Sequence, residues 1–278
     1  MRPEVNTVNH VKTALFVVAL LALATAPILA ETPDQRMRVG SGAVERDSWT
    51  GPTGGLPVRV VNHHGDVRLR HGGAEGNLEA AAVLQQLDVD GSRLALDVTV
   101  TDDELVVSIL RYDLEGTLIT QPSRTQLARA DLAVLVPAGA PVRAETTFGL
   151  IEARGVETDV DLETLNGTVR VAKTKGAITA SSRMGAVEVT LEAGATKKPQ
   201  RLTTETGPVT VFTPPDNDLD VTMKTSGALI TDFSLQVEHH EHEEPDKTAT
   251  ATVGEGGTPL VLTSKQGDLG LRRVVPRR

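Results

Sequence analysis

A short pattern repeated around seven glycines is the feature of this sequence that most restricts its fold. The glycines are Gly65, Gly149, Gly167, Gly185, Gly207, Gly227 and Gly267. Two and four residues after each glycine, thirteen of the fourteen positions are apolar, while the positions between them include Arg170 and Glu188. Alternation with a period of two is typical of a β-strand with one buried face.

A similar alternation precedes the glycines, with apolar residues at eleven of the fourteen positions that lie five and seven residues before them. Three positions before the glycine, six of the seven units carry a small polar residue: Asn62, Thr146, Thr164, Ser182, Thr204 and Ser264. Each unit is therefore predicted to be a strand, a tight turn and a second strand. Glycine suits the corner because a turn often needs a positive φ angle, which a Cβ atom disfavours.

The unit around Gly227 departs from this pattern, because Val221 and Met223 place its apolar face one residue out of phase. A β-bulge would restore the register there.

The spacing of the corners favours one kind of all-β architecture. Between Gly149 and Gly227 the steps are 18, 18, 22 and 20 residues. A nearly constant step of two short strands predicts a β-solenoid, a parallel β-helix-like stack in which each unit buries its face against its neighbours. The alternative is a series of antiparallel hairpins in a sandwich or barrel, which also places turn signals at regular intervals.

Composition excludes several classes of function. The chain has no Cys, so disulfides, thiolate nucleophiles and thiolate metal sites are ruled out. The formal charge is −9, and one Trp, one Tyr and four Phe are the only aromatic residues. This argues against nucleic-acid binding, which favours a basic face with stacking aromatics.

The first thirty residues are predicted to be a signal peptide. Arg2 and Lys12 precede an apolar run over 14–26, and Ala30 is a suitable residue before a cleavage point. The alternative is an uncleaved anchor, although the run is short for a membrane span of about 20 residues. No later stretch is apolar for long enough to span, so we expect an exported protein of the periplasm or cell surface, with no stable membrane span after cleavage.

The remaining chain divides around the repeat. Residues 31–55 are predicted to be a polar leader or linker, and 56–274 to be the β-repeat domain, followed by a basic tail at 275–278. Within the domain, 66–148 is a hairpin-containing insertion with strands expected at 94–100, 105–109 and 130–136, and 236–258 is a charged insertion. Because the ends of a stack must be capped, the segment 66–148 and the charged tail are the expected caps.

The segment 238–244, EHHEHEE, is the clearest candidate for chemistry. Imidazoles and carboxylates bind Zn²⁺, Ni²⁺ or Cu²⁺, so His239, His240 and His242 are candidate metal ligands, and a metal-binding periplasmic protein is the first alternative function. A solvated acidic insertion explains the same residues without a metal.

An enzyme is the second alternative. Asp159 and Asp161 alternate around Val160, which would suit the carboxylate pair of a β-helix polysaccharide hydrolase or lyase. Few aromatics are present to hold sugars, and the nucleophile-elbow, phosphate-loop and dinucleotide motifs are absent. We therefore expect a non-enzymatic protein without a cofactor.

Several segments together resemble the bacterial "putative adhesin" β-strand-repeat family, a domain of unknown function. They are VNHHGDVRLR, ADLAVLVPAGAPVRAETTFGLIEARG, LETLNGTVRV, SSRMGAVEV and TTETGPVTV, which lie within residues 57–271. The resemblance implies an exported envelope protein and supplies no catalytic residues; the His/Glu segment departs from the family pattern.

The leading interpretation is an interaction scaffold for an envelope protein or polysaccharide. Outward residues at one sequence offset would form ladders across the stack, for example Glu152, Arg170, Glu188 and Thr210.

Overall fold

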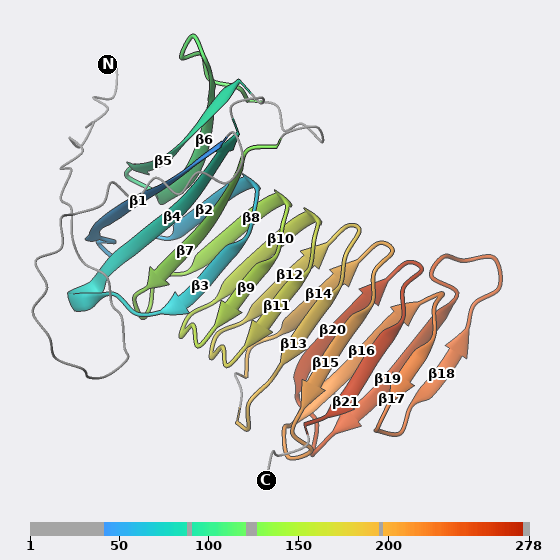
Figure 1. Cartoon of the computed structure of the whole chain (residues 1–278). Helices are drawn as coiled ribbons and strands as arrows, with labels where there is room; N and C mark the ends of the chain where they lie inside the picture. The colour runs from blue at the N-terminus through green and yellow to red at the C-terminus, as the bar shows by residue number, and fades with distance from the viewer. Residues whose placement is uncertain (1–41, 88–90, 121–126, 195–196, 275–278) are drawn as a thin grey trace, which may run out of the picture.

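The structure is a computed structural model, which describes residues 42–87, 91–120, 127–194 and 197–274 (Figure 1). It is an all-β fold of two large mixed sheets, with one 3₁₀ turn, η1 (Ala74–Gly76), and no α-helix in these ranges. Within the same ranges, no helix is long and apolar enough to cross a membrane. The predicted signal peptide and basic tail lie outside the described residues.

The strands of each sheet have a spatial order that differs from their order in the chain. Sheet A contains β1 (Gly42–Pro52), β4 (Asn77–Leu87), β7 (Arg129–Val136), β3 (Val67–His71), β9 (Ile151–Arg154), β11 (Val169–Ala172), β13 (Val187–Thr190), β15 (Val209–Thr213), β21 (Leu269–Arg273) and β17 (Leu229–Thr231). Sheet B contains β18 (Gln236–His239), β19 (Lys247–Val253), β16 (Leu219–Thr225), β20 (Thr258–Ser264), β14 (Gln200–Thr204), β12 (Ile178–Ser182), β10 (Val160–Asn166), β8 (Val142–Phe148), β2 (Val58–His64), β6 (Leu105–Asp113) and β5 (Ser92–Val100).

Each glycine-centred unit contributes one strand to sheet B and the next to sheet A, as the alternating pattern predicts. We call such a pair of strands a rung. Neighbouring rungs pair in parallel at equal sequence offsets, so that Leu162 lies between Ala144 and Ala180. The apolar inward residues of both sheets are Val, Leu, Ile and Ala, together with Met223, and they form one continuous buried core between the sheets. This packing explains how a chain with few aromatics builds its interior.

The corner glycines are needed for close packing between rungs rather than for a special backbone angle. A Cβ atom on Gly167 would overlap the carbonyl oxygen of Gly149, and one on Gly185 would overlap that of Gly167. Among the seven corner glycines, only Gly65 and Gly149 have positive φ. The predicted reason for glycine is therefore wrong at the other five corners, where the neighbouring backbone leaves no room for a side chain.

The small polar residues before the glycines are buried and bind the corners together. Thr204 donates to the carbonyl oxygen of its own Gly207, and Asn62 donates to that of Ala130. The other hydroxyls, and that of Thr225 in the unit around Gly227, donate to the carbonyl oxygen of the adjacent corner glycine: Thr146 to Gly65 (3.3 Å), Thr164 to Gly149 (3.3 Å), Ser182 to Gly167 (2.8 Å), Ser264 to Gly207 (3.0 Å) and Thr225 to Gly267 (2.6 Å). We call this series the corner ladder. It satisfies polar backbone groups that the stacked rungs remove from water.

The order of rungs in space differs from their order in the sequence. β20 lies between β14 and β16, and β21 lies between β15 and β17 (Figure 1). The rung formed by β20 and β21, here called the inserted rung, therefore separates two rungs that precede it in the chain.

The out-of-phase unit around Gly227 contains a shorter corner and not the predicted bulge. Val221 lies opposite Leu260 and Met223 opposite Leu262, so the apolar faces stay in register. Thr225 then takes the place of the small polar residue, two positions before the glycine instead of three. The register is kept because the turn of this unit is one residue shorter than the turns of the other units.

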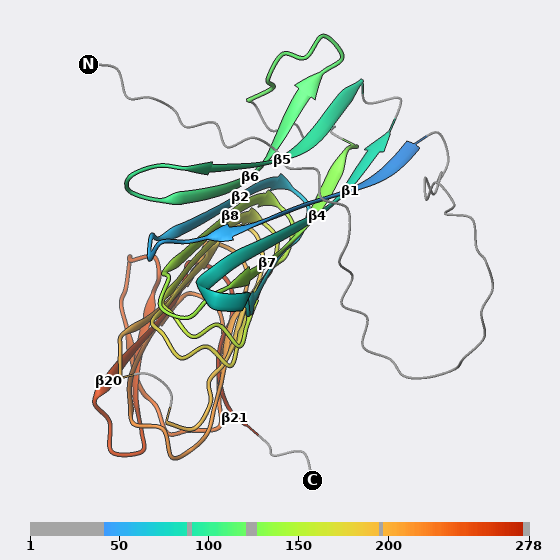
Figure 2. The ribbon, with the colours of Figure 1, turned by 90° about the vertical axis from the view of Figure 1, so that its left-hand side faces the viewer.

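Antiparallel strands close the N-terminal end of the stack. β1 pairs with β4, β4 pairs with β7, and the predicted hairpin is present as β5 and β6 (Figure 2). The structure differs from the predicted leader at 31–55, because residues 42–52 form β1 along the edge of sheet A. The segment 66–148 thus supplies part of a cap, as expected.

The opposite end is covered by an element that the sequence did not identify as a cap. β18 and β19 form an antiparallel pair beyond β16 at the edge of sheet B. They come from the charged insertion at 236–258, whereas the arginines at 272–273 end β21, inside sheet A. The basic tail at 275–278, the other predicted cap, lies outside the described residues.

Candidate functional site

A polar groove of about 650 Å³ runs across the outer face of sheet B. It crosses five parallel strands, β2, β8, β10, β12 and β14, and we call it the sheet B groove. Its apolar lining is limited to Val61 and Leu165; the other lining residues are polar or charged. Most of the lining residues can therefore make hydrogen bonds to a ligand.

The groove follows from the parallel register of the rungs. Because neighbouring rungs align at equal offsets, outward side chains form rows perpendicular to the strands, about 4.8 Å apart. One row runs from Glu145 through Glu163 and Ser181 to Thr203. A second row, two residues nearer the corner, includes Thr147, Leu165, Arg183 and Glu205.

Ion pairs order the charged side chains of the groove. Arg143 lies 2.6 Å from Glu145 and 3.4 Å from Glu163, and Arg59 lies 3.1 Å from Glu145. Burial raises the pKa of Glu145, but hydrogen bonds from Arg59 and Arg143 lower it more, so the net pKa is below its usual value. Glu145 is therefore a carboxylate at neutral pH, suited to accept hydrogen bonds.

At the other end of the groove, Arg183 pairs with Glu205 at 3.0 Å. Lys265 of the inserted rung reaches the other carboxylate oxygen of Glu205 at 3.8 Å. The hydroxyls of Ser181 and Thr203 lie beside this pair in the adjoining row, so the groove offers both signs of charge and neutral donors.

The ladder expected on sheet A is also present. Arg170 lies opposite Glu152 on one side and Glu188 on the other, and Glu188 lies opposite Thr210. A second hollow of about 460 Å³ adjoins this row. The predicted arrangement of outward residues at one offset is thus confirmed on both sheets.

The structure does not bring the three candidate metal-binding histidines together. His239 ends β18; His240 donates its backbone N–H to the Asp246 carbonyl at 2.7 Å, and its Nε2 lies 3.1 Å from the Thr248 hydroxyl. His242 is in a turn with positive φ. Across the described ranges, no group of three or more His, Asp or Glu side chains is placed to hold a metal ion. Metal binding by His239, His240 and His242 stays a prediction.

The candidate carboxylate pair is engaged in ion pairs. Both carboxylate oxygens of Asp159 lie 2.8 Å from Lys198 Nζ, and one accepts the Ala177 N–H at 2.9 Å. The hydrogen bond from Lys198 holds the pKa of Asp159 below its usual value. A glycosidase needs one carboxyl group with a raised pKa to act as general acid, so Asp159 is poorly suited to that role. Asp161 lies 3.5 Å from Arg143.

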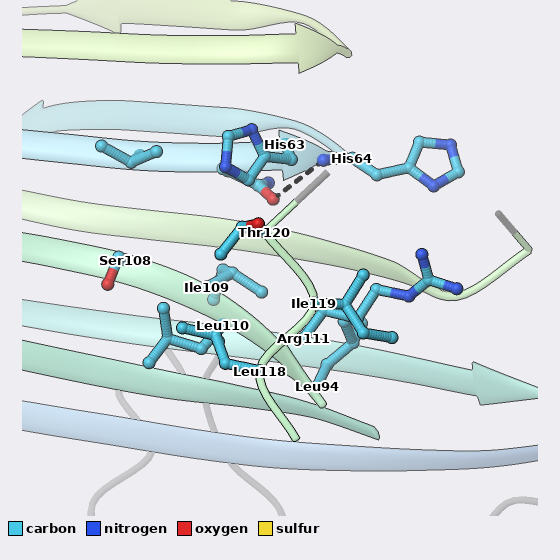
Figure 3. A pocket seen from close by; sticks show the side chains of 12 residues that line it. His63, His64, Leu94, Ser108, Ile109, Leu110, Arg111, Leu118, Ile119 and Thr120 are labelled. Carbon is cyan, nitrogen blue, oxygen red and sulfur yellow. Dashed lines mark hydrogen bonds between the residues drawn. The ribbon is translucent and has the colours of Figure 1, made fainter. Parts of the chain in front are cut away.

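A small pocket of about 160 Å³ lies between the end of β2 and the β5–β6 hairpin (Figure 3). Leu94, Ile109 and Leu118 contribute apolar walls, and His63 and His64 lie at its rim. The His64 ring is held by a contact of 2.8 Å between Nδ1 and the Ala128 carbonyl oxygen, and it packs edge-on against Phe148. No local sequence pattern predicts this pocket, because its walls come from segments about fifty residues apart in the chain.

No family model matches the sequence, and no curated protein matches it significantly. The fold is similar to crystal structures of bacterial proteins described as adhesins. One is a "putative cell adhesion protein" from Clostridium sporogenes, with 12% identity, a TM-score of 0.45, and coverage of 83% of this chain and 100% of that one. A "putative adhesin" from Bacteroides fragilis has 10% identity, a TM-score of 0.29, and coverage of 83% and 97%.

These neighbours carry the same description as the family that the sequence resembles. At such low identity they give no argument for function, which has to be inferred from the chain's own residues.

Proposed function

We propose that this chain is an exported, non-enzymatic interaction scaffold of the bacterial envelope, which binds an extended polysaccharide along the sheet B groove. The observation that carries the proposal is the register of the groove: five parallel strands present outward side chains in rows, one position per strand, and all of these except Val61 and Leu165 are polar or charged. The pairing of consecutive rungs also supports our proposal that the parallel part is a two-sided β-solenoid.

The repeat distance of the groove favours a sugar polymer. Rows on adjacent strands are about 4.8 Å apart, whereas an extended peptide advances only about 3.3 Å per residue. A pyranose ring in an extended β-linked glycan advances by about one strand spacing, so successive sugars would meet equivalent positions on successive rungs.

The chemistry of the lining suits a ligand rich in hydroxyl groups. Within the part of the chain that the structure describes, no Trp, Tyr or Phe lines the groove, so a sugar would be held by hydrogen bonds and not by stacking on an aromatic ring. Carboxylates, guanidinium groups and hydroxyls can instead bind the vicinal hydroxyls of sugars. Each exposed contact contributes little, so affinity requires many of them along one chain.

A non-enzymatic role agrees with the state of the carboxylates. Asp159 is neutralised by Lys198, and Glu145 by two arginines. Neither is placed as a carboxylic acid ready to protonate a glycosidic oxygen. Binding without cleavage is the function that this lining supports best.

Calorimetry with β-1,4-linked oligosaccharides of increasing length tests the proposal. We expect affinity to rise with length until the oligosaccharide spans the five strands. Arg183→Ala, in the groove, should weaken binding about tenfold, because a charged hydrogen-bonding partner is lost. Arg170→Ala, on the outer face of sheet A, is the matched control and should leave affinity unchanged. Affinity independent of length, or equal loss in both variants, would contradict the proposal.

Export is tested separately, by fractionating cells that produce the chain with and without residues 1–30. We expect the longer chain in the periplasm or at the surface, shortened by the leader, and the shorter chain in the cytoplasm.

A further inference from the structure

The inserted rung is held only by segments that precede it in the sequence. β20 pairs with β14 and β16, and β21 pairs with β15 and β17, all in parallel. Without this rung, these four strands would face an empty slot with unpaired backbone donors and acceptors on both sides. Unpaired strand edges are templates for another strand.

The inserted rung enters and leaves the stack at the same side. The Thr258 N–H donates to the Asp218 carbonyl, and the Val274 N–H donates to the Thr213 carbonyl, so both ends of the rung lie at the turn between β15 and β16. Figure 2 shows β20 and β21 in opposite sheets. The rung is therefore an arch around Gly267, which can leave the slot sideways without threading through the fold.

The connection into the arch is suited to act as a hinge. Gly254, Gly256 and Gly257 all have positive φ, a conformation that glycine adopts at low cost. Two carboxylates hold this connection: Asp218 accepts the Glu255 N–H at 2.8 Å, and Asp220 accepts the Gly257 N–H at 3.0 Å.

From this arrangement we propose that the slot accepts the inserted rung of a second copy of this chain. An exchanged rung makes every strand pairing that the chain's own rung makes, and only the hinge differs between the two states. Exchange of identical elements is a low-cost route to oligomers, and a chain that donates its rung while accepting another can link copies in series. The proposal concerns self-association and is independent of polysaccharide binding.

Cross-linking across the slot tests this in a chain that has no Cys of its own. Thr203 of β14 and Thr263 of β20 are partly exposed neighbours in the parallel register, at a separation that suits a disulfide. When full-length Thr203→Cys and Thr263→Cys proteins are mixed under mild denaturant, diluted and oxidised, a mixed disulfide forms rapidly only if one copy's rung occupies the other's slot.

Glu163→Cys of β10 is the matched control, because it lies in the same outward row but does not adjoin β20. We expect Thr263→Cys to link to Thr203→Cys about ten times faster than to Glu163→Cys, since paired thiols react at a raised effective concentration. Asp218→Ala with Asp220→Ala should increase the mixed product by loosening the hinge. Equal rates for the two pairs would overturn the proposal.

A second variant separates exchange from general aggregation. The double variant Thr203→Cys/Thr263→Cys, oxidised within one chain, locks the rung in its own slot. After the same denaturation and dilution, we expect the locked protein to sediment as a monomer and the unmodified chain to form dimers. Association of the locked protein to the same extent would also overturn the proposal.

Discussion

The side-chain Nζ of Lys247 lies 2.7 Å from the carbonyl oxygen of Gly227, the last corner glycine of the stack in space. It also lies 3.1 Å from the Ser226 carbonyl oxygen. At the five steps of the corner ladder the donor to the glycine carbonyl is the hydroxyl of a Ser or Thr on the adjacent rung. Lys247, on β19, thus ends the ladder where no further rung follows.

Replacing Lys247 with Met should destabilise the protein by about 1–2 kcal/mol, because two partly buried carbonyl groups lose a charged donor. Urea unfolding of the variant measures this difference. Lys224→Met, on the exposed side of β16, is the control and should change the free energy of unfolding by less than about 0.5 kcal/mol. Equal effects would mean that Lys247 does not cap the ladder.

A side chain at a corner glycine should be more damaging. Gly167→Ala places a Cβ against the Gly149 carbonyl oxygen, and the two rungs must separate locally to accommodate it. We expect a loss of about 2–3 kcal/mol, as in other overpacked sites. Arg170→Ala, which removes an exposed side chain three residues away, should lower the free energy of unfolding much less. Thermal unfolding of both variants measures the difference. The reverse order would refute the assignment of the corner.

The buried hydroxyls of the corner ladder can be compared with exposed ones on the same strand. Ser182→Ala removes the donor to the Gly167 carbonyl and leaves that oxygen without its partner. The expected cost is about 1–3 kcal/mol. Ser181→Ala, which points outward into the groove, should leave stability within about 0.5 kcal/mol of the unmodified protein. Chemical denaturation of both variants measures the two free energies of unfolding. Equal losses would contradict a stabilising role for the Ser182 hydroxyl.

The ion pair between Asp159 and Lys198 predicts a pH-dependent contribution. The pKa of Asp159 is lowered in the folded state, so its stabilisation is present above the ordinary carboxyl pKa and is lost as pH falls through the folded-state value. Because both side chains are largely exposed, Lys198→Met should cost only about 0–1 kcal/mol at pH 7.

The difference between this variant and the unmodified protein should shrink as the pH falls below about 4. Urea unfolding at pH 7, 5 and 3 measures it, with Lys197→Met as the neighbouring control. A difference that stays constant over this range would show that Asp159 is not the partner that matters.

The alternation around the glycines was sufficient to predict the strands, their buried faces and the ladder from Glu152 to Thr210, because these depend on local period and equal spacing. The order of rungs could not be predicted in this way. Any two rungs with matched apolar faces can pair. The residues around Leu260 of β20 and Val221 of β16 form similar apolar patterns, so the local sequence does not predict which of these strands lies next to Leu202 of β14.

The groove and the cap also depended on information beyond the local pattern. Outward polar residues such as Ser181 and Arg183 are visible in the sequence, but their alignment into one groove requires the register of five strands. Residues 42–52 looked like a leader because glycines and charged residues interrupt their alternation. An edge strand tolerates such residues, since one of its sides remains in water.

The position of the inserted rung changes how the end of the molecule comes apart. In a stack built in sequence order, the outermost unit peels away as a free tail. Here the outermost strands, β16 to β19, belong to a segment anchored at both of its ends, at β15 and at β20. A loop with fixed ends gains less conformational entropy on release than a tail of the same length. The topology therefore protects this end from fraying, a protection that small exported proteins commonly obtain from disulfides.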